Sequence, residues 1–189
     1  MASAPFETVI LTVTLYGILL IALTMFSTIS RIVTRNSLEI RLQEVANQVA
    51  MEITTVYSLC QQSTGDIGLF KQIEVPASIY EKGYAIEVKK ETVEVIVEGV
   101  LKAVEIWIVE ARLQDSSGLK ASSSIWDGNV PVSVETGEGY FQVDSKTGTY
   151  NVKYSSILHS GADNPVVWAK KNNGEIIVGV GTAKKMEGV

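Results

Sequence analysis

The first 62 residues show a helical hydrophobic pattern that changes character once. Residues 8–30 form a run of 23 residues without Asp, Glu, Lys, Arg or His. At a helical rise of roughly 1.5 Å per residue, this run spans about 35 Å, slightly more than the roughly 30 Å hydrocarbon layer of a bilayer. The run is therefore long enough to cross a membrane as a helix.

After Ser30 the helical period continues on one face only. Apolar residues recur at spacings of three and four between charged and amide side chains, which predicts an amphipathic helix. These residues are Leu38, Leu42, Val45, Val49, Ile53, Val56 and Cys60. No Pro or Gly interrupts residues 18–63, and the first strong stop signal is at residues 63–66. We expect one helix from about Glu7 to about Gln62.

From Leu69 the hydrophobic period becomes two, which predicts strands with one face on a core and one face in water. The first alternating positions are Ile73 and Val75, then residues 84–88, 93–97 and 104–108. A break near Glu98 and Gly99 divides residues 91–113 into two strands. Further strands are expected at residues 123–126, 130–135, 140–143, 150–154, 166–170 and 176–180, with turns at 146–148 and 172–174.

These elements predict an α+β fold, in which a long N-terminal hydrophobic helix precedes an antiparallel β-sandwich-like globular domain. We expect the helix to occupy residues 1–62 and the β domain residues 63–189. Loops are expected at residues 115–118 and 155–164, and the polar tail at 184–189 is expected to be loose.

The composition narrows the function. The net charge is −5 and no block of basic residues occurs, so a nucleic-acid-binding surface is not expected. Cys60 is the single cysteine, which excludes an intrachain disulfide, and we expect it to be a small apolar residue on a helix face.

Residue types that carry catalysis or bind cofactors are scarce. His159 is the only histidine and lies in a predicted loop, so neither a zinc cluster nor a Ser-His-Asp triad is expected. Gly179 and Gly181 have no following helix to make a phosphate site. The acidic loops around Asp115 and Asp127 lack the ligand spacing of a calcium-binding EF-hand. The tryptophans Trp107, Trp126 and Trp168 fall in predicted strands, where contacts in the core or between subunits are their usual roles. We expect no enzymatic activity, no cofactor and no metal site.

Several interpretations of residues 8–30 compete. A signal peptide would have a basic segment before the run, whereas here Glu7 precedes it and arginines follow. A buried core helix seldom stays uncharged for six turns. A permanent membrane anchor and a helix that moves from the membrane into a filament core remain. The run holds small residues that permit close helix packing: Thr12, Thr14, Gly17, Ala22, Thr24, Ser27 and Thr28.

The N-terminal part of the chain resembles the N-terminal helix of archaeal type IV pilin-like proteins, a group that includes adhesion pilins and archaellins. The resemblance lies in the pair Phe6-Glu7, the uncharged run to Ser30 and the amphipathic continuation to Cys60. A second likeness lies in the β pattern of residues 73–79, 82–88 and 93–95. The resemblance implies that the helices pack into a filament core while the β domains face outward.

On this interpretation the chain is a structural subunit of an extracellular filament that serves adhesion or motility. Its partners would be copies of itself, the membrane before assembly, a prepilin peptidase and the pilus assembly machinery. The polymerisation helix would use Phe6, Glu7, Tyr16, Gly17, Leu20, Phe26, Leu38, Leu42, Val45, Val49, Ile53 and Val56. Glu7 would lie close to an α-amino group of the same or a neighbouring subunit, which would offset its desolvation.

Two features leave alternatives open. Residues 1–6 contain no Lys or Arg, so a leader has been removed, or a short uncharged leader is cut near Ala4, or the chain is not processed. The apolar run is followed by Arg31, Arg35 and Arg41. The positive-inside rule alone would therefore place the β domain in the cytoplasm. A cysteine-poor, turn-rich β domain on a stalk favours the exterior. The alternative function is a single-span, membrane-anchored β-domain binding or stator protein of the cell envelope.

Overall fold

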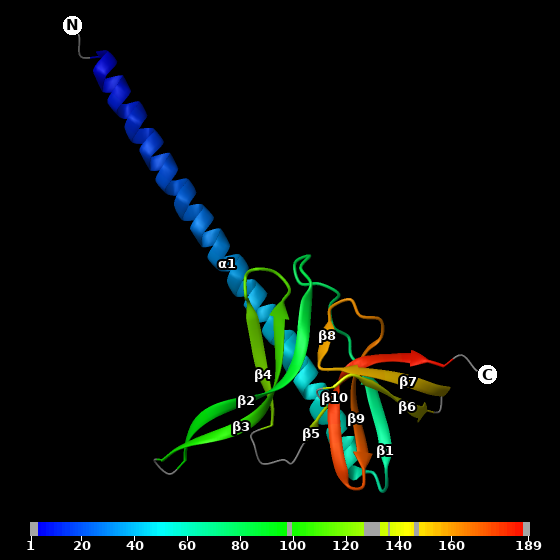
Figure 1. Ribbon diagram of the computed structural model, residues 1–189. Coiled ribbons are helices and arrows are strands. Elements are labelled where there is room, and N and C mark those ends of the chain that lie inside the picture. The colour runs from blue at the N-terminus through cyan, green and yellow to red at the C-terminus, as the bar shows by residue number, and fades with distance from the viewer. Residues whose placement is uncertain (1–3, 98–99, 127–132, 136, 146–147, 187–189) are drawn as a thin grey trace. The chain divides into compact units, whose positions relative to one another are not determined.

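A long helix and a set of strands make up the chain, seen in a computed structural model that describes residues 4–97, 100–126, 133–135, 137–145 and 148–186 (Figure 1). The chain divides into two compact units, Met1–Leu38 and Glu39–Val189. Helix α1, Ala4–Gln62, forms the first unit and continues into the second. The expected helix and its C-terminal end near Gln62 are confirmed.

Ten strands in the described part of the second unit form two sheets. The α+β fold with antiparallel sheets after the helix is confirmed. The strands are β1 (Ile67–Gln72), β2 (Tyr84–Val97), β3 (Val100–Leu113), β4 (Lys120–Trp126), β5 (Ser133–Val134), β6 (Gly139–Ser145), β7 (Gly148–Ser155), β8 (Ile157–His159), β9 (Pro165–Asn172) and β10 (Glu175–Lys185).

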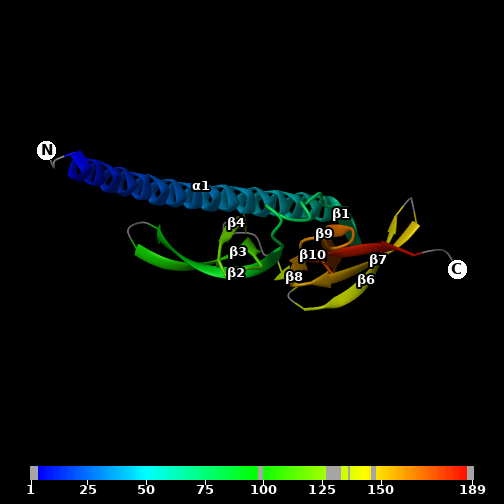
Figure 2. The ribbon, with the colours of Figure 1, turned by 90° about the horizontal axis from the view of Figure 1, so that it is seen from above.

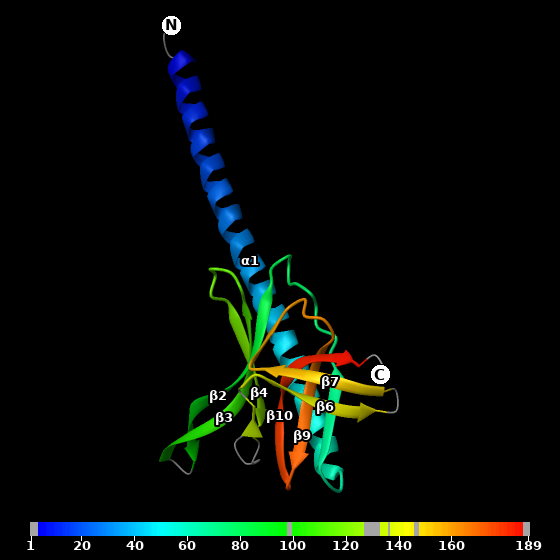
Figure 3. The ribbon, with the colours of Figure 1, turned by 45° about the vertical axis from the view of Figure 1, so that its right-hand side comes forward.

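The larger sheet has the order β1-β9-β10-β7-β6, and β5 pairs in parallel with β10. The smaller sheet has the order β4-β3-β2-β8, and every other strand pair in both sheets is antiparallel. The two sheets lie side by side in the second unit (Figure 3). The division of residues 91–113 into two strands is confirmed by β2 and β3, while Glu98 and Gly99 lie outside the described residues. The expected loop at residues 115–118 is also confirmed.

The larger sheet curls so that β6 comes back beside β1. A Cβ atom placed on Gly68 in β1 would lie 3.3 Å from Phe141 and 3.4 Å from Val143, both in β6. The curled face encloses Trp168, which is 2% exposed and has the rings of Phe141 and Tyr154 at 5.0 and 5.2 Å. Trp168 is therefore a core residue of this sheet.

Glycines in β10 make room for these large side chains. A Cβ on Gly179 would lie 2.7 Å from the Trp168 ring, closer than real Cβ contacts allow. A Cβ on Gly181 would lie 2.2 Å from the backbone oxygen of Lys153. Close packing thus accounts for the Gly179 and Gly181 pair, which is typical of glycine inside a strand.

The other face of the larger sheet carries buried aliphatic residues from β9 and β10, among them Val167 and Val178. Residues 39–62 of α1 lie along both sheets (Figure 2). Polar contacts tie the helix to its strands: Gln43 donates to the Ser122 oxygen at 2.9 Å, and Lys71 pairs with Glu52 at 2.6 Å. This segment is the core helix of the second unit.

Several strand predictions need correction. Ile73 and Val75 follow β1 rather than forming a strand, because the chain leaves the sheet at Gln72 and the Glu74 oxygen accepts a hydrogen bond from Gln48. His159 ends β8, which pairs with β2 through only three residue pairs where a loop was expected.

The tail prediction is also wrong in part. Lys184 and Lys185 belong to β10, since they pair with Asn151 and Tyr150 of β7. Residues 130–132, 146–147 and 187–189 of the predicted elements lie outside the described residues.

Candidate assembly surface

The first unit presents an apolar surface on all sides of the helix. α1 is long and apolar enough to cross a membrane: its most apolar window of 18 residues has a mean hydropathy of 2.4, and none of that window is buried. The polymerisation residues expected here are exposed: Phe6 by 68%, Tyr16 by 63%, Leu20 by 63% and Phe26 by 73%. Such a surface needs an external partner, either lipid or other protein.

The hydroxyl groups of this segment do not make it polar. The Oγ1 atoms of Thr12 and Thr14 donate to the carbonyl oxygens four residues earlier, both at 2.7 Å. Thr24 and Thr28 make the same contact at 3.0 and 2.9 Å. Because these donors are satisfied within the helix, they can face lipid or another helix without a desolvation penalty.

Gly17 forms a gap in this surface. No atom of the described residues lies within 4 Å of a Cβ placed on it, so no contact in that part of the chain requires glycine there. A helix interior favours Ala over Gly by roughly 0.5–1 kcal/mol. Close approach of a second backbone is a physical reason for glycine at such a position.

Glu7 is the acidic residue in the first turn of α1. A carboxylate in that position interacts favourably with the positive end of the helix dipole. Its pairing with an α-amino group of another subunit stays a prediction.

The second half of the helix gives a different result. Its apolar stripe is buried within the second unit, with exposures between 0% and 3%: Leu42, Val45, Val49, Ile53 and Val56. Leu38, at the end of the first unit, is buried as well. The chain itself therefore covers these side chains, and their expected role in contacts between neighbouring subunits stays a prediction.

The solvent-facing side of the same segment carries three exposed large apolar residues. Ile40, Met51 and Leu59 are exposed by 60%, 70% and 54%. Sequence periodicity did not distinguish this side, because its apolar residues are sparse and stand among polar ones. Cys60 is on the buried side, and burial raises the pKa of its thiol, so it behaves as the apolar residue that was expected.

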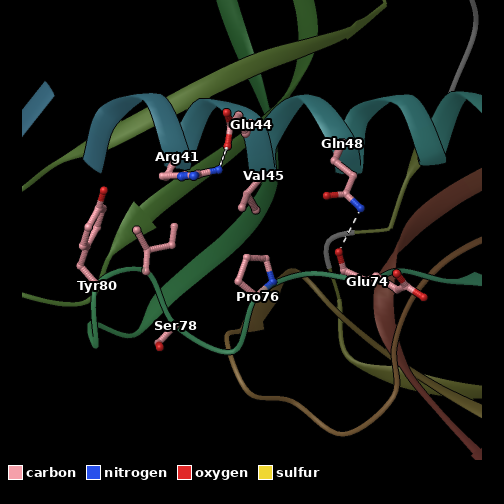
Figure 4. A pocket seen from close by; sticks show the side chains of 9 residues that line it. Arg41, Glu44, Val45, Gln48, Glu74, Pro76, Ser78 and Tyr80 are labelled. Carbon is pink, nitrogen blue, oxygen red and sulfur yellow. Dashed lines mark hydrogen bonds and ion pairs between the residues drawn. The ribbon is translucent and has the colours of Figure 1, made fainter. Parts of the chain in front are cut away.

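A groove of about 570 Å³ runs between this helix segment and residues 74–80 (Figure 4). Arg41 donates to Glu44 at 2.7 Å, and Gln48 donates to the Glu74 backbone oxygen at 3.0 Å. Its polar groups are thus largely paired with one another. The arrangement holds the loop against the helix and presents no pair of groups poised for acid–base catalysis.

A strained turn closes one end of this groove. Tyr80 and Glu81 have φ values of 48° and 63°, in the left-handed region that non-glycine residues rarely adopt. The backbones of Ile79 and Lys82 exchange two hydrogen bonds of 3.0 Å across the turn. The turn leaves the Tyr80 ring 61% exposed at the rim.

Glu110 is the buried charged residue of the described core, with 5% exposure. Lys89 and Lys120 bind the same carboxylate oxygen at 2.7 and 3.0 Å. Burial raises the pKa of Glu110, but the hydrogen bonds from the two lysines outweigh burial and lower it overall. The carboxylate is therefore a charged structural group held by two lysines through one of its oxygens.

No group of three or more His, Cys, Asp and Glu side chains among the described residues could hold a metal ion. His159 is exposed and its Nδ1 contacts the amide of Gln114.

No protein-family model, curated protein sequence or solved structure matches the chain.

Proposed function

We propose that this chain is a structural subunit of an extracellular type IV pilus-like filament, which polymerises through its N-terminal helix and serves adhesion or motility. The observation that carries the proposal is the exposed, uncharged surface of residues 8–30, on a helix that continues into a β domain. The likeness of residues 6–62 to archaeal pilin-like helices supports it.

Two environments cover this apolar surface in turn. Before assembly the bilayer covers it, and in a filament copies of the same helix replace the lipid. A contact between two different faces of identical subunits does not close on itself and generates a helical filament. The internally satisfied threonines and the gap at Gly17 suit both environments.

The proposal sets the partners and the location. The unassembled subunit resides in the cell membrane, where a prepilin peptidase and the pilus assembly machinery act on it. The assembled form is an extracellular surface filament with the β domain outward. The subunit has a structural role, without catalysis, cofactor or nucleic-acid ligand.

A second candidate is a single-span, membrane-anchored β-domain binding or stator protein of the cell envelope. Two observations favour it: Arg31 and Arg35 follow the apolar run, and the stripe from Leu42 to Val56 is covered by the chain itself. A single copy would need no further protein partner along the helix.

Shearing of surface filaments from cells that produce the chain separates the two candidates. The filament proposal predicts that the chain is the dominant band of the sheared, sedimentable fraction, with a mature N-terminus within residues 1–6. Recovery solely as detergent-soluble monomer would overturn the proposal and support the anchor. Glu7→Ala tests the charge pairing separately, since unchanged filament yield and length would remove that idea alone.

A further inference from the structure

A basic groove lies on the larger sheet, between β6, β7 and β10. It measures about 510 Å³ and includes Lys153, Lys184, Lys185 and Tyr140 in its lining. Lys153 of β7 pairs across the ladders with Thr182 on one side and with Tyr140 on the other. The groove is therefore built on three hydrogen-bonded strands.

The positive charge of this groove is uncompensated among the described residues. None of its three lysines forms an ion pair there, whereas Lys71, Lys82, Lys89, Lys90 and Lys120 all do. The Lys153 ammonium lies 6.0 Å from the centre of the Tyr140 ring, which is 64% exposed. Glu138 lines the adjoining groove that shares Lys153. Three lysines without an ion-pair partner among the described residues, beside an exposed aromatic ring in a chain of net charge −5, indicate an anionic partner.

An acidic projection occurs in the same unit. β2 pairs with β8 only at residues 85–87, and β4 pairs with β3 only at residues 107–112. Among the described residues, 90–97 and 100–106 are therefore paired only with each other, as a two-stranded ribbon whose edges have no strand partner there. A ribbon of two strands is marginally stable alone, and free edges invite a partner.

The charge of the ribbon is opposite to that of the groove. Residues 90–105 contain four glutamates and two lysines, a net charge of −2. Glu91 and Glu94 are exposed and make no ion pair among the described residues, while Glu105 is paired with Lys90 at 3.2 Å. Glu91 and Glu94 are three residues apart on β2, so their side chains lie on opposite faces of the ribbon and both border its β2 edge, where a groove can receive them.

The ribbon and the groove lie at opposite ends of the second unit. In all three ribbon views, the far end of β2 and β3 points away from the end where β6, β7 and the last residues of β10 lie (Figures 1, 2 and 3). Opposite charges at opposite ends suit a head-to-tail contact between copies.

We propose that the acidic β2–β3 ribbon of one subunit docks in the basic groove of the next, with Glu91 and Glu94 facing Lys153 and Lys184. The contact deepens the filament proposal and rests on it for the presence of neighbouring copies. Each exposed ion pair is weak by itself, so the pairs set register and direction while the helices hold the subunits together. The contact weakens as salt concentration rises.

Charge reversal with rescue tests this contact in the full chain. The ribbon variant carries Glu91→Lys and Glu94→Lys, the groove variant carries Lys153→Glu and Lys184→Glu, and a third variant carries all four changes. A carbodiimide, which joins Lys to carboxylates in direct contact, is applied to isolated membranes and to sheared filaments. The control carries Glu81→Lys and Glu175→Lys, two exposed sites outside the ribbon with the same charge change.

We expect the ribbon and groove variants each to lose about tenfold of the cross-linked dimer, and the fourfold variant to return to within about threefold of wild type. The control should match wild type. An unchanged amount of cross-linked dimer in the ribbon and groove variants, or no rescue in the fourfold variant, overturns the contact. Retention on immobilised alginate that only groove-reversed variants lose, without rescue, assigns the groove to an acidic polysaccharide instead.

The two proposals fail separately. If filaments form but ignore all charge reversals, the contact is wrong and the filament stands. If no filaments form but the membrane dimer follows the reversal and rescue, the contact stands and the filament is wrong.

Discussion

The two halves of α1 share one helical period but differ in what covers their apolar residues. Up to residue 36 every side chain described from Phe6 onward is exposed, whereas from Leu42 to Cys60 one stripe is almost completely buried. The buried stripe is satisfied by the chain's own sheets. The apolar side chains of the exposed half are not covered by any described part of the chain, so their surface has to be explained by assembly or by lipid.

This difference separates two kinds of sensitivity. Changes in the exposed half should alter insertion or assembly and leave the unfolding of the second unit unchanged. Changes in the buried stripe should lower the free energy of unfolding whether or not the chain assembles. The following variants test whether the halves are as independent as their burial indicates.

The largest effect is expected for Leu20→Lys in the exposed half. A lysine near the centre of a spanning helix costs about 2.5–3.5 kcal/mol of insertion free energy, and it would leave an unpaired charge between packed helices. Membrane flotation and filament yield should both fall strongly, while Leu20→Ile behaves like wild type. Full flotation and normal filaments from Leu20→Lys would contradict a buried role for this face.

In the buried half, Ile53→Ala should lower the free energy of unfolding of the second unit by about 2–5 kcal/mol, because it opens a cavity at a site of 0% exposure. Met51→Ala is the matched control on the opposite side of the helix, where 70% exposure predicts a change within about 0.5 kcal/mol. Urea unfolding of the detergent-solubilised chain measures both. Equal losses from the two variants would mean that the helix faces are misassigned.

A smaller loss is expected from Gly179→Ala, by about 1–3 kcal/mol, since the added methyl group would meet the Trp168 ring at 2.7 Å. Gly17→Ala is the same chemical change in the exposed half, where no atom lies within 4 Å. It should leave urea unfolding unchanged and affect only assembly. A destabilised second unit in Gly17→Ala would show that the halves are coupled.

The smallest effect is a pH dependence. Burial raises the pKa of Tyr84 to about 12 from 10.0, and its hydroxyl donates to the Pro76 oxygen. Because the tyrosine loses its proton at lower pH in the unfolded chain than in the folded one, ionisation favours unfolding. The free energy of unfolding is therefore unaffected below pH 10.0 and falls as the pH rises toward about 12. Between these two pH values, the urea concentration at the midpoint of unfolding should fall in wild type and fall less in Tyr84→Phe. Parallel profiles would exclude Tyr84 as the cause.

The helix and most strands were predictable because their periods are unbroken over many residues. β2 and β3 were separated correctly, because a turn signal lies between the alternating pattern that starts at Val93 and the one that starts at Val104. β1 and β8 escaped prediction for different reasons. β1 contains Gly68, which is required by Phe141 of a distant strand, and β8 is only three residues long.

The candidate site was predictable only in its first half. A helix that is apolar on all sides indicates a partner outside the chain, and residues 8–30 are exposed as this pattern predicts. A one-sided stripe such as Leu42 to Val56 does not reveal whether its partner is the same chain or a neighbour. The two lysines on Glu110 and the groove around Lys153 come from strands distant in sequence, so no local pattern could indicate them.

The most direct test of the central claim uses a cysteine in the exposed half. Cys60 is buried, so the wild-type chain serves as an unreactive control. Leu20→Cys should give a ladder of multimers when intact filaments or cells are treated with a short bis-maleimide, because each helix packs against several copies in a filament core. A Leu20→Cys chain that stays monomeric under these conditions would contradict assembly through this helix.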